Sequence, residues 1–142
     1  MGPMGSPVFE VIDHTADIGI IAYGSDLHEL FANAARGMFS LLLEIETVAP
    51  REERFVEVEG IDLEGLLISW LNELLYLYTA EGLALSQFDI MELADGRLRA
   101  RVRGERADPS RHHPHLDIKA ATYHQLEIKG DGTWSARIIF DI

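Results

Sequence analysis

The stretch Asp26–Leu43, DLHELFANAARGMFSLLL, decides the fold class because it predicts a long amphipathic helix. Asp26 followed by Glu29 is a capping pattern, in which both side chains satisfy backbone N–H groups at a helix start. Apolar residues then recur three or four positions apart, at Leu27, Leu30, Phe31, Ala34, Met38, Phe39 and Leu42. This spacing predicts a helix from Asp26 to Leu43 with one buried face.

A second helix is predicted from Leu63 to Thr79, with Asp62 as its cap. This segment is apolar around most of its circumference, which is typical of a helix that lies deep in a domain. We expect it to pack between a sheet on one side and the first helix on the other. Gly82 is the expected left-handed stop after it.

The rest of the chain predicts antiparallel strands. Asp95-Gly96 predicts a two-residue hairpin turn and Gly130–Gly132 a second turn, with a polar loop over residues 104–117 between the hairpins. The predicted strands are Val8–Ile12, Ile18–Tyr23, Phe55–Glu59, Leu85–Leu93, Arg97–Arg103, Ile118–Ile128 and Trp134–Phe140. This order predicts a single α+β domain over residues 8–142, with two helices packed on antiparallel sheet. Residues 1–7 read as a flexible lead, and we detect no sequence repeat.

Composition excludes several classes of protein. The chain of 142 residues has no cysteine, which excludes disulfides, thiolate zinc sites and a cysteine nucleophile, and fits a cytoplasmic location. The first residues do not predict a signal peptide, and we find no apolar run long enough to span a bilayer. The net charge is −12, and residues 1–96 carry 3 Lys or Arg against 18 Asp or Glu. This charge argues against sequence-nonspecific binding of nucleic acid.

Two acidic groups are candidates for a hard-cation site. The cluster Asp13-His14-Thr15-Ala16-Asp17 supplies oxygen ligands or acid–base groups, although its spacing alone favours an ordinary turn. At the other end of the sequence, Asp141 adjoins the carboxylate of Ile142. Two such anions repel each other unless a cation or donor lies between them, and the alternative is a solvated chain end.

Two basic groups have competing interpretations. His112, His113 and His115 with Asp117 resemble a transition-metal cluster, but histidines in a proline-containing loop are more often solvated. Arg97, Arg99, Arg101 and Arg103 alternate with apolar residues, which places them on one face of a strand. This stripe is either a phosphate-binding surface or, as we slightly favour, a solvent face that pairs with acids and protects an edge strand.

An ordered set of motifs resembles a known family. These motifs are DHTADIGIIAYG (residues 13–24), DLHELFANAARGMF (26–39), LEGLLISWLNELL (63–75), Gly104-Glu105, KAATYH (119–124) and Asp141-Ile142. Together they resemble the archease family, small proteins that assist the GTP- and Mn-dependent RNA ligase of tRNA splicing and RNA repair. The resemblance implies a fold of two related strand–helix–strand–strand units. It also implies an accessory cofactor that promotes guanylylation and multiple turnover of the ligase, and that is not itself an enzyme.

The resemblance further implies a divalent-metal site. Carried onto this chain, the ligands are Asp17, Asp141 and the Ile142 carboxylate. Asp13 and His14 lie beside them, and Lys119 is a candidate partner contact. Oxygen ligands suit calcium, our first expectation, or magnesium or manganese better than zinc. The alternatives to a ligase cofactor are a freestanding metal-dependent phosphoesterase and a small RNA-binding module that uses the arginine stripe.

Overall fold

The computed structural model describes residues 8–13 and 17–142. Strands and helices alternate early and hairpins follow, as the sequence predicts, which confirms the α+β class. The elements are β1 Phe9–Asp13, β2 Ile18–Gly24, α1 Leu27–Leu42, a 3-10 turn Ile45–Thr47, β3 Glu52–Glu59, α2 Leu63–Thr79, β4 Leu83–Ala94, β5 Arg97–Arg106, α3 Pro109–His112, β6 Ala120–Asp131 and β7 Thr133–Asp141. The predicted flexible lead, residues 1–7, lies outside the described residues.

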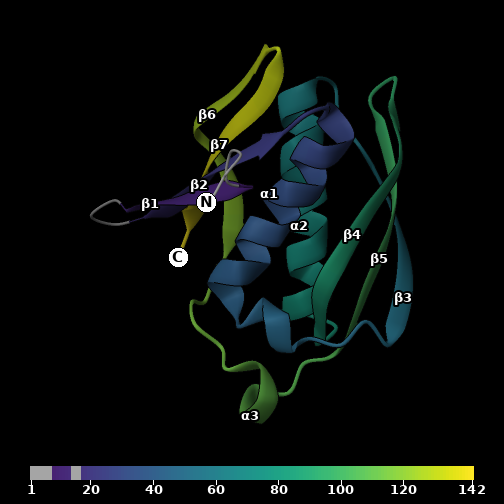
Figure 1. Ribbon diagram of the computed structural model, residues 1–142, viewed down its shortest axis with the longest axis vertical. Coiled ribbons are helices and arrows are strands. Elements are labelled where there is room, and N and C mark those ends of the chain that lie inside the picture. The colour runs from purple at the N-terminus through teal and green to yellow at the C-terminus, as the bar shows by residue number, and fades with distance from the viewer. Residues whose placement is uncertain (1–7, 14–16) are drawn as a thin grey trace.

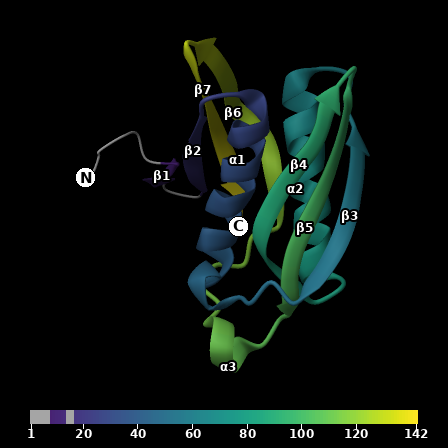
Figure 2. The ribbon, with the colours of Figure 1, turned by 45° about the vertical axis from the view of Figure 1, so that its right-hand side comes forward.

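The two long helices lie between two antiparallel sheets (Figures 1 and 2). One sheet has the strand order β1-β2-β7-β6 and the other β3-β5-β4. Helix α1 contacts β2 of the first sheet and β4 of the second, and α2 contacts β6 and β3 in the same way. The expectation that α2 meets a sheet on one side only is therefore wrong. A helix covered by sheet on two sides must be apolar over most of its surface, as α2 is.

The core fills the layer between the sheets. Trp70, Phe31, Phe39 and Leu71 are fully buried there. The indole Nε1 of Trp70 donates a hydrogen bond of 2.9 Å to the carbonyl of Phe31, which satisfies its one polar group and ties α2 to α1.

The sheets are built from two nested units of the same topology. The first unit consists of β2, α1, β6 and β7, and the second of β3, α2, β4 and β5. In each, a strand and helix are followed by a hairpin whose second strand pairs with the opening strand, giving the orders β2-β7-β6 and β3-β5-β4. The second unit is inserted within the first. This agrees with the pair of related units that the family resemblance implies.

The two units share a short strand-to-helix junction, Gly-x-Asp-Leu. The Asp26 carboxylate accepts from the Glu29 N–H at 2.8 Å, and that of Asp62 from the Gly65 N–H at 2.7 Å. Both predicted helix caps are thereby confirmed. The shared stretch is only four residues long, which is too short to stand out as a repeat in the sequence.

The glycine of each junction is required by a close approach of the backbone. A Cβ atom on Gly24 would lie 2.4 Å from the nitrogen of Leu30, and one on Gly60 would lie 2.5 Å from that of Leu66. Contacts this short force the helix away from its strand. Each unit therefore uses the same device to start its helix directly over the strand end.

The hairpin turns follow the sequence closely. Asp95 and Gly96 both have positive φ, 55° and 72°, as a type I′ turn requires. Gly82, with φ of 69°, ends the α2 region as predicted. The second hairpin is tighter than predicted, because Asp131 pairs with Thr133 and only Gly132 lies between them.

Candidate functional site

Strand pairing brings the two ends of the predicted metal site toward each other. Ile18 of β2 pairs with Phe140 of β7, so the residues just outside this pair are Asp17 and Asp141. Continuation of the antiparallel register sets these two residues opposite each other. Because Phe140 points into the core, the alternation of side chains directs the two carboxylates to the outer face of the sheet.

Neighbouring strands add Lys119 and Asp13 to this end of the sheet. The backbone N–H of Lys119 donates to the carbonyl of Asp141 at 2.7 Å. Asp13, the last residue of β1, pairs with Ile18 through its backbone. The Asp13 side chain and the whole of His14 lie outside what the structure describes, so their predicted roles stay predictions. Asp141, Ile142 and Lys119 are exposed, and Asp17 is partly so.

The second unit has an ion pair at the position equivalent to Asp17 and Asp141. With the two junctions superposed along the sequence, Glu53 of β3 corresponds to Asp17, and Arg103 of β5 corresponds to Asp141. Glu53 pairs with Arg103, and the guanidinium Nη2 lies 3.1 Å from the carboxylate. The first unit instead has two carboxylates at this position. Two carboxylates at facing positions repel each other unless a cation or a donor lies between them.

The donor set at Asp17 and Asp141 consists of hard oxygens. Within the described residues, neither carboxylate forms an ion pair with a basic side chain, and no group of three or more His, Cys, Asp or Glu side chains gathers around a common point. A metal held here therefore takes two side-chain carboxylates, with the Ile142 carboxylate or water for the rest of its shell. That chemistry fits Ca²⁺, Mg²⁺ or Mn²⁺.

A second polar cluster, around buried Glu105, is one that sequence reasoning missed. The His112 Nε2 lies 2.9 Å from the carboxylate, and the backbone N–H of Ala49 donates to it at 2.9 Å. Arg111 and Arg51 approach the same group at 2.8 and 3.3 Å. The predicted solvation of the three histidines is wrong for His112, which is 1% exposed. His113 and His115 are exposed, so the three rings do not converge.

The surroundings of Glu105 lower its pKa, and the partners of His112 select one arrangement of its ring. The hydrogen bond from Arg111, with those from Ala49 and His112, lowers the pKa of Glu105 from 4.5 to about 2. The Asp108 N–H donates to the His112 Nδ1 at 3.0 Å, so Nε2 carries the proton that faces Glu105. These bonds fasten the loop that contains α3 to β5 and to the segment after α1. The cluster is a structural clamp.

The arginine stripe lies on the outer face of the second sheet, where it is paired with acids. Arg103 pairs with Glu53, Arg101 with Asp89 at 2.9 Å, and Arg99 with Glu92 at 3.6 Å. The predicted pairing with surplus acids is confirmed for these three of the four arginines. The predicted protection of an edge strand is wrong, because β5 is the central strand of its sheet.

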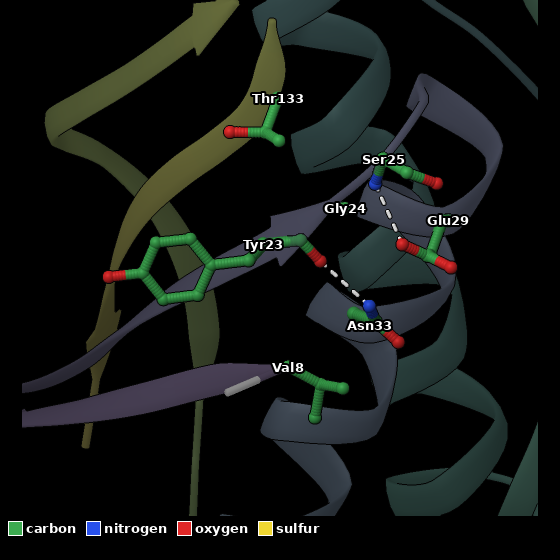
Figure 3. A pocket seen from close by; sticks show the side chains of 7 residues that line it. All are labelled: Val8, Tyr23, Gly24, Ser25, Glu29, Asn33 and Thr133. Atoms are coloured by element: carbon green, nitrogen blue, oxygen red, sulfur yellow. Dashed lines mark hydrogen bonds between the residues drawn. The ribbon is translucent and has the colours of Figure 1, made fainter. Parts of the chain in front are cut away.

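A shallow hollow lies at the opposite end of β2, between that strand, α1 and the β6–β7 turn (Figure 3). The carbonyl of Tyr23 accepts from Asn33 Nδ2 at 2.7 Å, and the Glu29 carboxylate accepts from the Ser25 N–H at the same distance. The Tyr23 ring points away from α1 (Figure 3), and its hydroxyl donates to Glu10. That bond raises the pKa of Tyr23. The polar groups of the hollow are thus largely used within the fold.

The fold and the site together define a class of protein: a two-sheet α+β domain with a paired-carboxylate sheet end. Residues 9–142 match the model of the archease protein family. Protein archease of Pyrococcus furiosus is 42% identical over 139 residues, which is 94% of this chain and 98% of that protein. Protein archease of Methanosarcina mazei is 38% identical, with 99% of each chain covered. The solution structure of Methanobacterium thermoautotrophicum protein 1598 superposes with a TM-score of 0.82 at 37% identity, covering 95% of this chain and 99% of that one.

The chain belongs to the archease family. Within the described residues, neither long helix has the length and hydrophobicity that crossing a bilayer requires.

Proposed function

We propose that this protein activates a GTP- and Mn-dependent RNA ligase of tRNA splicing or RNA repair in the cytoplasm. It promotes guanylylation of the ligase and its multiple turnover, and acts as an accessory protein rather than as an enzyme. Membership of the archease family over residues 9–142 is the observation that carries this proposal.

A divalent metal ion, calcium first and magnesium or manganese next, belongs to this function. Asp17, Asp141 and the Ile142 carboxylate are its proposed ligands, with Asp13 and His14 beside them. Support comes from the β2–β7 register and from the ion pair that replaces the two carboxylates in the second unit. Bound there, the ion supplies positive charge that neutralises the facing carboxylates.

The acidic sheet end is the proposed contact with the ligase. The protein has a net charge of −12, whereas a site that handles GTP and RNA phosphates is cationic. Electrostatic attraction then steers Asp17 and Asp141 toward that site, and exposed Lys119 is placed to pair with an acidic group of the ligase. We expect this association to slow as the salt concentration rises, and an encounter rate independent of salt would contradict the docking.

The test counts ligations per ligase molecule. A cognate ligase is mixed with GTP, Mn²⁺, excess cleaved RNA and a substoichiometric amount of this protein. Wild type raises turnover well above one per ligase, whereas Asp17→Ala and a variant lacking Ile142 do not. Asp131→Ala is the matched control, because it removes an exposed carboxylate from the turn between β6 and β7.

Other results separate the alternatives. Stimulation by all variants alike keeps the ligase role and contradicts the metal site. No stimulation of an active cognate ligase contradicts the proposed function. Cleavage of a phosphodiester by the protein alone, lost in Asp17→Ala, indicates a phosphoesterase. Retention of RNA that is lost in Arg99→Glu/Arg101→Glu indicates an RNA-binding module.

A further inference from the structure

The two units differ at one edge of their sheets. In the first sheet the order is β1-β2-β7-β6, so β1 lies outside the opening strand of the first unit. In the second sheet the order is β3-β5-β4, and no strand of the described chain lies outside β3. Figures 1 and 2 show β3 as the outermost strand on its side. The place that β1 occupies in one unit is thus open in the other.

The backbone of β3 presents hydrogen-bonding groups to that open place. The Gly60 N–H donates to the Gly96 carbonyl, so even-numbered residues of β3 bond to β5 and odd-numbered ones face away. The outward residues are Glu53, Phe55, Glu57 and Glu59. In the first unit, the residue equivalent to Glu59 is Tyr23, whose N–H donates to the Val8 carbonyl beside β1 at 2.9 Å. In both units the odd-numbered residues of the opening strand face away from its hairpin partner. The N–H of Glu59 therefore points to where an added strand could accept a hydrogen bond from it.

The side chains along this edge specify the charge of an occupant. Glu53, Glu57 and Glu59 are exposed, and between them Phe55 is 68% exposed. Glu53 and Glu57 also lie within 3.8 Å of arginines of β5, so an added basic strand shares these two carboxylates with β5. On the helix behind, Glu73 occupies the position that Gly37 holds in α1, where the ring of Phe9 packs from β1. On its outer face an added strand therefore meets three glutamates and one aromatic ring.

A second copy of this chain fits the edge poorly. Antiparallel pairing of β3 with its own copy, centred on Phe55, Val56 or Glu57, sets glutamate opposite glutamate. Like charges directly opposite across a strand pair are destabilising. A strand that alternates basic and apolar residues sets an attractive pair at each of these positions.

We propose that the open edge of β3 binds an extended segment of a protein partner, in which lysine or arginine alternates with apolar residues. The segment adds to the sheet as an antiparallel strand outside β3, in the place equivalent to that of β1. Its backbone pairs with Glu53, Phe55, Glu57 and Glu59, and its basic side chains, which all lie on one face, meet the glutamates and pass over the Phe55 ring. This inference is independent of the metal site, which lies in the other sheet.

The test uses the full-length protein and a short fluorescent peptide that alternates valine and lysine. Binding is followed by fluorescence anisotropy, and hydrogen exchange of backbone amides locates it. We expect the amides of Glu53, Phe55, Glu57 and Glu59 to become protected. Glu57→Pro removes one outward N–H without removing a bond to β5, and is tolerated on an edge strand. It should weaken binding about tenfold, and its charge-matched control Glu57→Gln, which keeps the N–H, distinctly less.

A peptide methylated on alternate backbone nitrogens repeats the test without altering the protein, and it should bind as weakly as Glu57→Pro does to the parent peptide. Binding that is unaffected by the proline or by the methyl groups reflects general attraction to an acidic protein and overturns the proposal. Absence of binding overturns it as well. So does protection confined to other strands, or a dimer in sedimentation that is dispersed by Glu57→Pro.

Discussion

The two nested units share one topology but differ in the side chains at the end of the pair formed by the opening strand and its hairpin partner. Both start a helix with Gly-x-Asp-Leu, and both pair the opening strand with the second strand of a hairpin. At one position, the second unit closes with an ion pair between Glu53 and Arg103, and the first sets Asp17 against Asp141. The lesson is that the fold tolerates a neutral pair there. We expect the second acid in the first unit to serve the proposed metal site rather than stability.

The largest expected effect on function comes from giving the first unit the arginine that the second unit has at the equivalent position. Asp141→Arg places a guanidinium opposite Asp17 and should remove both metal binding and ligase stimulation, because the pair is then neutral without an ion. Metal-dependent shifts in melting temperature and ligations per ligase measure the two losses. Asp131→Arg, the same change of charge at the far turn of the sheet, is the control and should leave both intact. A metal-dependent shift that survives in Asp141→Arg would break the comparison.

We expect substitutions in the second unit to lower the free energy of unfolding more than substitutions in the first unit. Strand β5 continues past Arg103 to Glu105, the buried centre of the clamp. Glu105→Ala should lower the free energy of unfolding by about 3 kcal/mol, because His112 and the Ala49 N–H lose their buried acceptor. Urea denaturation measures the loss, and Glu127→Ala on exposed β6 should change stability little. Equal losses in the two variants would show that the clamp is not a stabilising feature.

The same carboxylate predicts a pH dependence. Its pKa falls from 4.5 in the unfolded chain to about 2 in the folded protein, so its contribution to stability is present above pH 4.5. The contribution is lost as the pH falls from 4.5 toward 2. The difference in unfolding free energy between wild type and Glu105→Gln should therefore shrink over that range. A difference that stays constant there would contradict the assigned pKa.

The junction glycines test whether the units are equivalent. Gly24→Ala and Gly60→Ala should each lower the free energy of unfolding by about 2 kcal/mol, since each methyl group meets helix backbone at similar distances. Thermal or urea unfolding of both single variants makes the comparison. Gly132→Ala is a control for steric crowding, because nothing lies within 4 Å of a Cβ there, although its positive φ adds strain. Unequal losses of unfolding free energy at Gly24 and Gly60 would show that the two junctions contribute differently to stability.

The smallest expected effect is at the caps. Asp26→Ala and Asp62→Ala should each cost about 1 kcal/mol, because each leaves one helix N–H without its acceptor. The same unfolding experiments measure it, with Asp26→Asn and Asp62→Asn as variants that keep a capping side chain. A full loss of stability in the asparagine variants would show that charge rather than capping matters.

The sequence predicts what local chemistry decides. Both helices, their aspartate caps and the Asp95-Gly96 turn depend on residues a few positions apart, and the structure confirms them. The second sheet and the nesting were not predictable in this way, because β2 finds its partner β7 across most of the chain. The prediction that the arginine stripe lies on an edge strand was wrong for the same reason, because no local pattern indicates which strand of a sheet is central.

The two polar clusters were predictable to different extents. The burial of His112 depends on Glu105, Ala49 and Asp108, which come from a strand, a loop and a helix start with no shared periodicity. The approach of Asp17 to Asp141 was reached only through the family resemblance. The β2–β7 register agrees with that approach, and metal binding there stays a prediction.

Nesting also sets an order for assembly during synthesis. The second unit occupies one continuous stretch, Glu52–Arg106, so all its strands leave the ribosome before β6 and β7 do. The edge of β2 that pairs with β7 stays without its partner until Phe140 arrives opposite Ile18. We expect the second unit to template the first, and Asp17 to meet Asp141 as the closing event of folding. Possession of this pair of acids then marks a molecule whose translation has run past β7, and a nascent or clipped chain lacks it.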